Sequence, residues 1–240
     1  MTITSPHNDK LKALRKLRQR RHDRDRTGQF VAEGEDLLAA ADAAGWTPVQ
    51  RFAVSGSGLP GIEVDAAALR SASDLASGTR TLAIYNERWE AAALGGLCVY
   101  LHGVGDPGNV GSVLRTAAAF GASCVALGPG TADPFSPRAV RASMGAIFTV
   151  PVAHSTPARL PGTTIALDAR AERPLCAVAA DLVPQAEISV LVGAERDGLP
   201  DEAIAGADHL ARIPIATDSL NAAVAAAVAL YELTRRISLA

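Results

Sequence analysis

The stretch that decides the fold is LHGVGDPGNVGSVLRTAAAFGA, residues 101–122, which follows an apolar run and opens an alanine-rich segment. Three of its glycines match the pattern GxGxxG: Gly103, Gly105 and Gly108. A strand, a glycine turn and a helix in this order are the context that a dinucleotide site requires. Such a site also needs an acid about 20 residues further on, but the strand-like run at 124–130 carries none and Asp133 lies beyond a Pro-Gly turn. Pro107 also removes a backbone N–H that would face phosphate, so the dinucleotide interpretation is weakened and stays an alternative.

Two later stretches resemble the first in their make-up, because in each a strand-like run leads into a loop with polar side chains. LVGAERDGLP covers 191–200, and IPIATDSLNAAVAAAVALYE covers 213–232. Taken singly, each polar residue has an ordinary explanation. Asn109 can cap the helix that follows it, Glu195 can be a loop carboxylate, and Asp218 or Ser219 can cap the last helix.

Taken together, the three stretches carry the patterns N-x-G-x-x-x-R-x-A, G-x-E-x-x-G-L and I-P-I…S-L-N, in this order. This combination resembles the SpoU-type (TrmH-like) RNA ribose 2′-O-methyltransferases of the SPOUT class. The resemblance is strong over 97–240. It implies an α/β domain with a mainly parallel sheet and a C-terminal trefoil knot, because members of that class share this fold. Residues 1–90 resemble, more weakly, the small α/β domain with which the family grips RNA.

The resemblance also implies a cofactor, S-adenosylmethionine, held by backbone groups of the knotted loops. The residues that match those loops are Gly193, Ile213 and Leu220. Glycine suits such a loop because a backbone that approaches a ligand closely leaves no room for a side chain. The third motif is about two residues shorter than is usual in the family, which bears on the shape of the cofactor pocket.

Five residues are expected to form the catalytic site: Asn109, Arg115, Glu195, Ser219 and Asn221. Asn109 is expected to orient the target nucleotide, and Glu195 to fix Arg115 or its loop. A guanidinium stays protonated at every relevant pH, so Arg115 is expected to clamp a phosphate and stabilise a developing alkoxide. A phosphate oxygen or a water then takes the proton. Ser219 and Asn221 are expected to shape the site where the last helix begins.

Family members act as homodimers in which the arginine reaches across the interface, and we expect a homodimer here. The last helix has an apolar face that suits either an interface or core packing: Leu220, Val224, Val228 and Tyr231. An inactive knotted RNA-binding protein is the alternative function. The sequence leaves open whether the RNA is ribosomal or transfer RNA.

A basic stretch lies near the start of the chain. Residues 10–26, KLKALRKLRQRRHDRDR, hold nine of the 23 Lys and Arg residues against two acids. Three leucines recur at helical spacing: Leu11, Leu14 and Leu17. One face of a helix can therefore pack while the arginines point outward. The stretch is either a solvated basic helix or a phosphate-binding surface; in the second case the RNA contacts are Arg15, Arg18 and Arg21.

Residues 86–96, charged and then glycine-rich, suggest a linker between a domain at 1–90 and a domain at 97–240. In the first, a helix is expected to end at Gly45 and strands are expected near 51–56 and 81–86. In the second, short apolar runs alternate with helical ones, which indicates a mainly parallel sheet. Two runs, 147–153 and 163–169, read as strands joined only by HSTPARLPG, which is too short for a full crossover helix.

The composition is that of a globular protein: 240 residues, 48% hydrophobic and 20% charged, with a net charge of −2. The longest apolar run falls short of the roughly 18 residues of a membrane span. The start of the chain lacks an apolar signal core, so a cytoplasmic protein is expected. The three cysteines, Cys98, Cys124 and Cys176, fit no metal-binding spacing and are expected to be free thiols.

Overall fold

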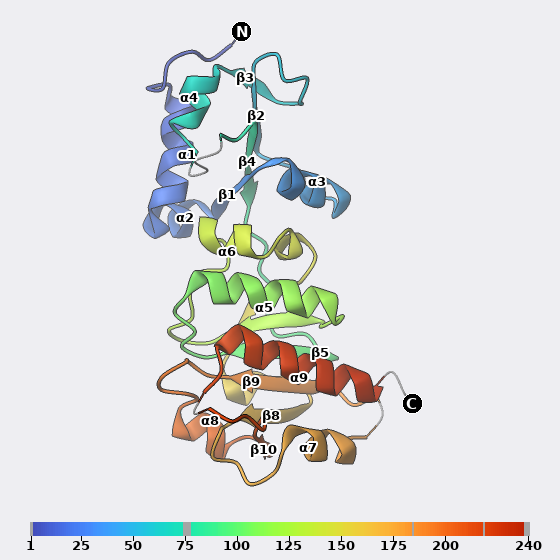
Figure 1. Cartoon of the computed structure of the whole chain (residues 1–240). Coiled ribbons are helices and arrows are strands. Elements are labelled where there is room, and N and C mark those ends of the chain that lie inside the picture. Colours follow the sequence, from blue (N-terminus) through green and yellow to red (C-terminus); the bar gives the residue numbers. More distant parts are fainter. Residues whose placement is uncertain (1, 74–77, 184, 218, 238–240) are drawn as a thin grey trace.

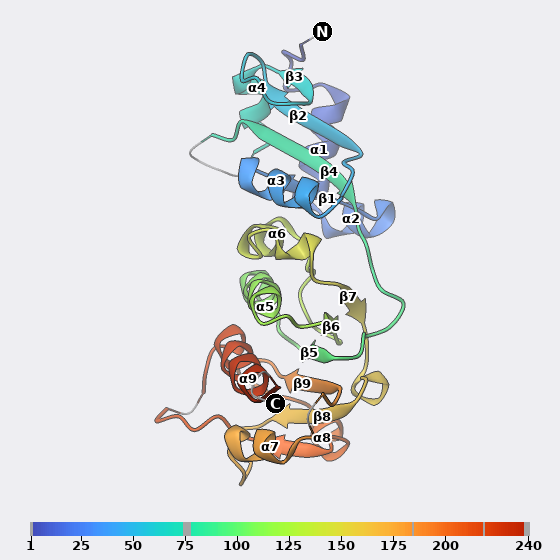
Figure 2. The ribbon, with the colours of Figure 1, turned by 90° about the vertical axis from the view of Figure 1, so that its right-hand side faces the viewer.

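The chain folds around two β-sheets, one above the other in an elongated molecule (Figure 1). The structure is a computed structural model, and it describes residues 2–73, 78–183, 185–217 and 219–237. The upper sheet uses residues 29–86 and the lower sheet uses residues 97–211. The segment after the upper sheet runs along the outside of the molecule to the first strand of the lower one (Figure 2).

The upper sheet has four strands in the order β1-β4-β2-β3, of which only β2 and β3 pair in parallel. The strands are β1 (Gln29–Glu33), β2 (Gln50–Val54), β3 (Ile62–Val64) and β4 (Thr81–Asn86). The helices are α1 (Asp9–Gln19), α2 (Arg21–Thr27), α3 (Glu35–Ala43) and α4 (Ala66–Arg70). Gly45 adopts φ 70° just after α3, as expected for a left-handed helix stop.

The basic stretch forms two helices, α1 and α2. The break falls at Arg20, whose backbone is extended, with φ −125° and ψ 113°. The three leucines of α1 are buried under the sheet together with Phe52 and Leu82, as their helical spacing predicts. The basic side chains of the two helices therefore divide between the surface and the interior, according to where each lies around its helix.

The lower sheet has six strands, all parallel, in the order β10-β8-β9-β5-β6-β7. The strands are β5 (Leu97–Leu101), β6 (Cys124–Leu127), β7 (Val152–His154), β8 (Thr163–Leu167), β9 (Ile188–Val192) and β10 (His209–Ala211). Every residue of β5, β6 and β9 is buried, as is usual for parallel strands covered on both faces. The expected α/β class with a mainly parallel sheet is confirmed; the trefoil knot stays a prediction.

Helices connect these strands and cover the sheet. They are α5 (Pro107–Ala119), α6 (Pro137–Ala142), α7 (Leu175–Asp181), α8 (Asp201–Ala205) and α9 (Ala222–Ile237). Helices α5 and α9 lie side by side on one face, and α6 lies between α5 and the upper sheet (Figure 2). Gly111 allows the close approach of α5 to α6, because a Cβ there would lie 2.3 Å from the carbonyl oxygen of Ala139.

One expected strand is shorter than the sequence pattern indicated, and one expected connection is as predicted. The run 147–153 was expected to be one strand, but Ala146–Phe148 form a 3₁₀ turn and only Val152–His154 pair with β6. Pro151 lies between them and lacks the N–H that a longer strand would use. The crossover from β7 to β8 contains only a 3₁₀ turn, Pro157–Arg159, so the prediction that it lacks a full helix is confirmed.

One hydrophobic core joins the upper and lower parts. Phe30 and Trp46 from the upper part pack against Phe135 and Phe148 from the lower part, with ring centroids 4.8–6.0 Å apart. The indole N–H of Trp46 donates to the carbonyl of Phe148 at 2.8 Å. The two sheets are therefore fixed to each other by packing.

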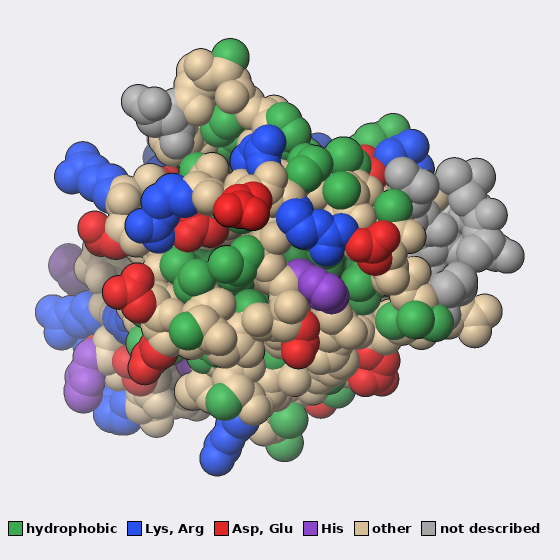
Figure 3. Space-filling model, turned by 90° about the horizontal axis from the view of Figure 1, so that it is seen from below, with side chains coloured by type: hydrophobic (Ala, Val, Ile, Leu, Met, Phe, Trp, Pro, Cys, Tyr) green, Lys and Arg blue, Asp and Glu red, His purple; other side chains and the backbone are tan. Residues whose placement is uncertain are grey.

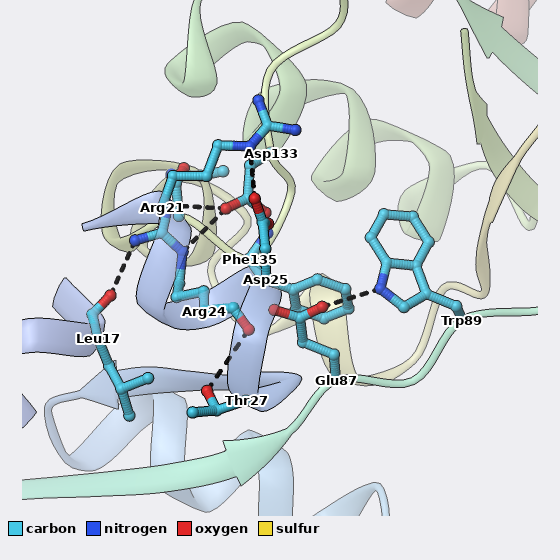
Figure 4. A network of polar contacts seen from close by, with 11 residues as sticks. Leu17, Arg21, Arg24, Asp25, Thr27, Glu87, Trp89, Asp133 and Phe135 are labelled. Carbon is cyan, nitrogen blue, oxygen red and sulfur yellow. Dashed lines mark hydrogen bonds and ion pairs between the residues drawn. The ribbon is translucent and has the colours of Figure 1, made fainter. Parts of the chain in front are cut away.

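A buried ion pair reinforces this junction (Figure 4). The guanidinium of Arg24 in α2 donates to Asp133 at 2.9 Å through Nε, and its Nη2 lies 2.7 Å from the same carboxylate oxygen. Arg24 Nη1 donates to the carbonyl of Leu17 at 2.8 Å, and Asp133 accepts the N–H of Phe135 at 2.7 Å. Both charges are thus paired and hydrogen-bonded, as buried charges need to be.

Candidate functional site

Polar side chains from all three sequence motifs meet at one edge of the lower sheet. Asn109 Nδ2 donates to the carboxylate of Glu195, and Asn221 Nδ2 donates to Asn109 Oδ1 at 3.0 Å. Asn221 Nδ2 also lies 3.4 Å from Glu195 Oε1. We call Asn109, Glu195 and Asn221 the amide–carboxylate cluster.

The topology explains this meeting. Strands β5 and β9 are parallel neighbours with Leu101 opposite Val192, so the loops that follow them emerge at the same edge. The first loop leads into α5, whose N-cap Asp106 accepts the N–H of Asn109 at 3.0 Å. Asn221 caps α9 in a similar way, because its Oδ1 accepts the N–H groups of Ala223 at 2.9 Å and Val224 at 3.3 Å. Carboxyl ends of strands in open α/β sheets are the usual place for ligands.

A cavity of about 400 Å³ opens beside the cluster, between the loops that follow β8 and β9 and the segment before α9. All three residues expected to hold a cofactor line it: Gly193, Ile213 and Leu220. Glu195 and Ser219 line it as well. Asp218, named in the sequence as an alternative cap, lies outside the described residues.

Gly193 is required by the backbone of its own loop. A Cβ at this position would lie 2.1 Å from the carbonyl carbon of Gly198 and 2.3 Å from the nitrogen of Leu199. Ala194 and Gly198 exchange two backbone hydrogen bonds of 3.1 and 3.0 Å, which close the loop tightly. The loop itself therefore leaves no room for a side chain at this position, and the expected close approach to a ligand stays a prediction.

The structure adds a cavity wall that the motifs did not indicate. Residues 167–170, at the end of β8 and just after it, also line the cavity. Asp168 accepts hydrogen bonds from the side chain of Arg170, which lowers the pKa of Asp168 below its usual value. The signal available in the sequence was positional, because β8 ends at the same sheet edge as β9.

Arg115 lies apart from the cavity of its own chain. It is exposed on α5, six residues after Asn109, and it does not line the cavity. Within the described part of the chain it makes no hydrogen bond or ion pair. The structure of one chain therefore brings together Asn109, Glu195, Ser219 and Asn221 without Arg115.

The basic residues near the start of the chain occupy different environments. Arg21 is exposed on α2, and its ion pair with Asp25 is 3.6 Å long. Arg15 is half-buried; it donates to the Ser71 hydroxyl at 3.1 Å and to the carbonyl of Pro6 at 2.7 Å. Both stay predictions as RNA contacts.

Arg18 requires a correction. Its side chain is only 5% exposed, its Nη1 donates to the carbonyl of Ala72, and its Nη2 lies 3.9 Å from Glu33. A guanidinium held inside the domain in this way cannot reach a phosphate of an RNA chain on the surface. Arg18 therefore stabilises the upper domain and does not belong to the expected RNA-binding set.

The end of the molecule nearest β10 carries charges of both signs. Acidic and basic side chains are interspersed over this face (Figure 3). In the described ranges no group of three or more His, Cys, Asp or Glu side chains is placed to hold a metal ion. None of the described helices is long and apolar enough to cross a membrane.

Comparison with known proteins gives two family matches. Residues 96–231 match the model of the SpoU rRNA methylase family, and residues 8–83 match that of the MRM3-like substrate binding domain. Among curated proteins, the chain is 28% identical to the 23S rRNA (guanosine(2553)-2′-O)-methyltransferase RlmP of Bacillus subtilis, over 96% of this chain and 98% of the relative. It is 30% identical to an uncharacterized tRNA/rRNA methyltransferase of Synechocystis, over 98% and 94% of the two chains.

Mycobacterial relatives share higher identity over a shorter stretch. An uncharacterized tRNA/rRNA methyltransferase of Mycobacterium bovis is 42% identical over 149 residues, and this chain spans about half the length of that relative.

Among solved structures, an AdoMet-bound rRNA methyltransferase from Sinorhizobium meliloti superposes with a TM-score of 0.86 at 30% identity, over 99% of this chain and 98% of that one. An RNA 2′-O ribose methyltransferase superposes with a TM-score of 0.78 at 28% identity over the full length of both chains. Sequence motifs, sheet order and family matches agree, and the chain belongs to the SpoU rRNA methylase family.

Proposed function

We propose that this protein transfers a methyl group from S-adenosylmethionine to a ribose 2′-oxygen of ribosomal RNA. The observation that carries the proposal is the amide–carboxylate cluster, in which all three motifs converge beside the cavity. Two relatives matched over nearly the whole chain support the choice of RNA: the Bacillus subtilis protein is named for 2′-O-methylation of 23S rRNA and the Sinorhizobium protein is an rRNA methyltransferase.

The cavity fits the cofactor in size and chemistry. Its volume of about 400 Å³ lies within the range of small-ligand sites, about 300–1,000 Å³. Leu199, Ile213 and Leu220 provide apolar walls, and Glu195 provides a carboxylate that complements a positive charge. S-adenosylmethionine supplies an electrophilic methyl group on a positively charged sulfur. Gly193, Ile213 and Leu220 would hold it, largely through backbone groups.

The cluster's residues have positioning roles in this proposal. Asn109 orients the target ribose, and Glu195 and Asn221 hold the amide of Asn109 in place through the hydrogen bonds described above. Ser219 shapes the wall beside the cofactor. Because correct placement of two reactants can supply much of the rate of a bimolecular reaction, positioning is expected to be a large part of catalysis.

Arg115 supplies the positive charge. It clamps a phosphate next to the target ribose and stabilises the negative charge that develops on the 2′-oxygen. It does not act as a base, because a guanidinium does not give up its proton near neutral pH. A phosphate oxygen or a water accepts the proton instead.

We further propose that the protein acts as a homodimer and that Arg115 completes the site of the partner subunit. Three apolar side chains form an exposed stripe on α9: Val224, Val228 and Tyr231, which are 47%, 37% and 55% exposed. A second copy of the chain would cover this stripe. Arg115 is exposed and does not line the cavity of its own chain, which supports a role across the interface.

The two domains have different roles in this proposal. Residues 1–90 form the RNA substrate-binding domain and residues 97–240 form the methyltransferase domain. An enzyme that modifies ribosomal RNA would work in the cytoplasm.

The test is transfer of radiolabelled methyl groups from S-adenosylmethionine to RNA from cells that lack this protein. Ribosomal and transfer RNA are assayed separately. Alkaline hydrolysis identifies 2′-O-methylation, because a methylated 2′-oxygen cannot attack the neighbouring phosphate and that linkage survives. Label in alkali-resistant dinucleotides from ribosomal RNA supports the proposal. Binding of RNA and cofactor without transfer would instead support the inactive RNA-binding protein.

A further inference from the structure

A second cavity, of about 650 Å³, lies at the junction of the two domains. One wall is Arg21 of α2, from the upper domain. The floor is formed by the loops that follow β5 and β6, with Pro107 at the start of α5 and Gly130 after β6. His154, the last residue of β7, closes a further side. We call this cavity the junction cleft. Pro107 lines the cleft and Asn109 belongs to the amide–carboxylate cluster, so both sites use the first turn of α5.

The ring of His154 is held in a fixed orientation. It stacks on the indole of Trp89, with ring centroids 4.1 Å apart and planes inclined by 18°. Trp89 is itself fixed, because its Nε1 donates to Glu87 at 2.9 Å and its ring packs edge-on against Phe135 at 5.3 Å. His154 is nevertheless exposed and lines the cleft. A flat ring that is supported on one face and exposed in a cleft can serve as a platform for a nucleobase.

The lining of the cleft also carries an available positive charge. Arg21 pairs with Asp25 at 3.6 Å, and both side chains are more than 60% exposed. Ion pairs this exposed are weak and easily exchanged for another partner. The neighbouring Arg24 and its partner Asp133 also line the cleft, but they are buried and paired with each other (Figure 4). Arg21 is therefore the cation of α2 that is available to a phosphate.

We propose that the junction cleft binds an RNA nucleotide adjacent to the one that is methylated, with its base stacked on His154 and its phosphate paired with Arg21. This inference rests on the proposed function for the identity of the ligand. Stacking on an aromatic ring tolerates any base, because every base has a π-face. The cleft therefore orients the strand that enters the site without reading its sequence.

The test measures binding of two fluorescein-labelled decamers by anisotropy: oligo(A) and an abasic ribose-phosphate chain of the same length. His154→Ala should lower the affinity for oligo(A) at least about fivefold, the scale of one lost base–aromatic stack, and leave the abasic affinity unchanged. His154→Phe should retain the oligo(A) affinity. His7→Ala, which removes an exposed histidine far from the cleft, is the matched control. Arg21→Ala should weaken both probes.

Three results would overturn the inference. The first is that the wild-type protein binds oligo(A) no more tightly than the abasic chain. The second is that His154→Ala weakens binding of both probes equally. The third is that His154→Phe loses affinity for oligo(A). Methyl transfer to ribosomal RNA is measured on the same preparations, so that the two proposals can fail separately. Transfer without a His154-dependent base preference refutes the cleft alone. A His154-dependent preference without transfer refutes the proposed function and leaves the cleft as a nucleotide-binding site.

Discussion

Asn109 and Glu195 are 86 residues apart in the chain, and the amide of the first donates a hydrogen bond to the carboxylate of the second. Asn221 completes the arrangement with an amide that reaches Asn109 at 3.0 Å while its own carbonyl oxygen caps α9. The same residue therefore has a local role in a helix and a long-range role in the site.

These two roles of Asn221 can be separated. Asn221→Ala removes both the cap and the donor, so the protein should lose about 1 kcal/mol of stability and most of its methyl transfer. Asn221→Ser retains a capping oxygen but lacks the Nδ2 donor, so its melting temperature should stay near that of the wild type while transfer still falls. Thermal unfolding and a transfer assay check the pair. Equal activity in Asn221→Ser and the wild type would contradict a positioning role for the donor.

Gly193→Ala is expected to weaken binding of S-adenosylmethionine strongly. The added Cβ would lie 2.1 Å from backbone of the same loop, so the loop must open, and with it the cavity wall. Isothermal calorimetry measures the affinity. Gly105→Ala is the matched control, because a Cβ there meets nothing closer than 4.0 Å. Unchanged affinity in Gly193→Ala would exclude this loop from the cofactor site.

Arg115→Ala should lower kcat at least about 10²-fold, the scale of one lost transition-state donor. Cofactor affinity and melting temperature should hardly change, because Arg115 is exposed and lies away from its own cavity. Arg115→Lys should restore little activity, since the ammonium group of lysine cannot make the paired hydrogen bonds of a planar guanidinium.

A mixture of Arg115→Ala and Gly193→Ala subunits tests whether the arginine acts across the dimer. If it does, each mixed dimer has one site with both defects and one intact site, and activity should rise above that of either variant alone. Subunit exchange is confirmed separately with differently tagged chains. Absence of recovery after confirmed exchange would place Arg115 in the site of its own subunit.

Exposed cations of the first two helices should set the salt dependence of RNA binding. Each phosphate contact with single-stranded RNA contributes a slope of about −0.7 in a plot of log K against log salt. Replacing Lys16, Arg20 and Arg21, all exposed, by alanine should flatten the slope by roughly two units. Arg159→Ala, an exposed cation far from these helices, should leave it unchanged. Arg18→Ala should instead lower stability, because its partners Ala72 and Glu33 lie inside the domain.

Removing one partner of the Arg24–Asp133 ion pair should lower the stability of the protein strongly. Asp133→Ala leaves the buried guanidinium of Arg24 without its carboxylate, and a loss of about 3–5 kcal/mol in the free energy of unfolding is expected. The double variant Arg24→Met with Asp133→Leu should recover much of this loss, since apolar pairs often replace buried ion pairs well. Urea unfolding checks both. A loss below about 1 kcal/mol in the single variant would mean that water reaches the pair.

The sequence predicted the class of the fold and pointed to the three residues that meet in the amide–carboxylate cluster, because short local patterns carry both. Asn109, Glu195 and Asn221 each follow a strand, and parallel strands deliver such residues to one edge. Arg18 could not be placed in this way. The basic residues of its helix lie on both sides of the leucine stripe, and the sequence does not distinguish among them. Arg18 is buried because Ala72 and Glu33, from distant parts of the chain, pack against it. Its environment depends on contacts between distant segments, which local spacing does not contain.

The continuous core between the two sheets fixes the distance between the upper and lower parts of the molecule. The junction is tightly packed by four aromatic side chains: Phe30, Trp46, Phe135 and Phe148. This packing holds α2 at a fixed distance from the cavity of the lower sheet. A flexible tether would let the catalytic domain sample many nucleotides around an anchoring point. Under the proposed function, a rigid junction would instead act as a spacer, and the nucleotide to be modified would be set by its distance from the point where the upper domain binds the RNA.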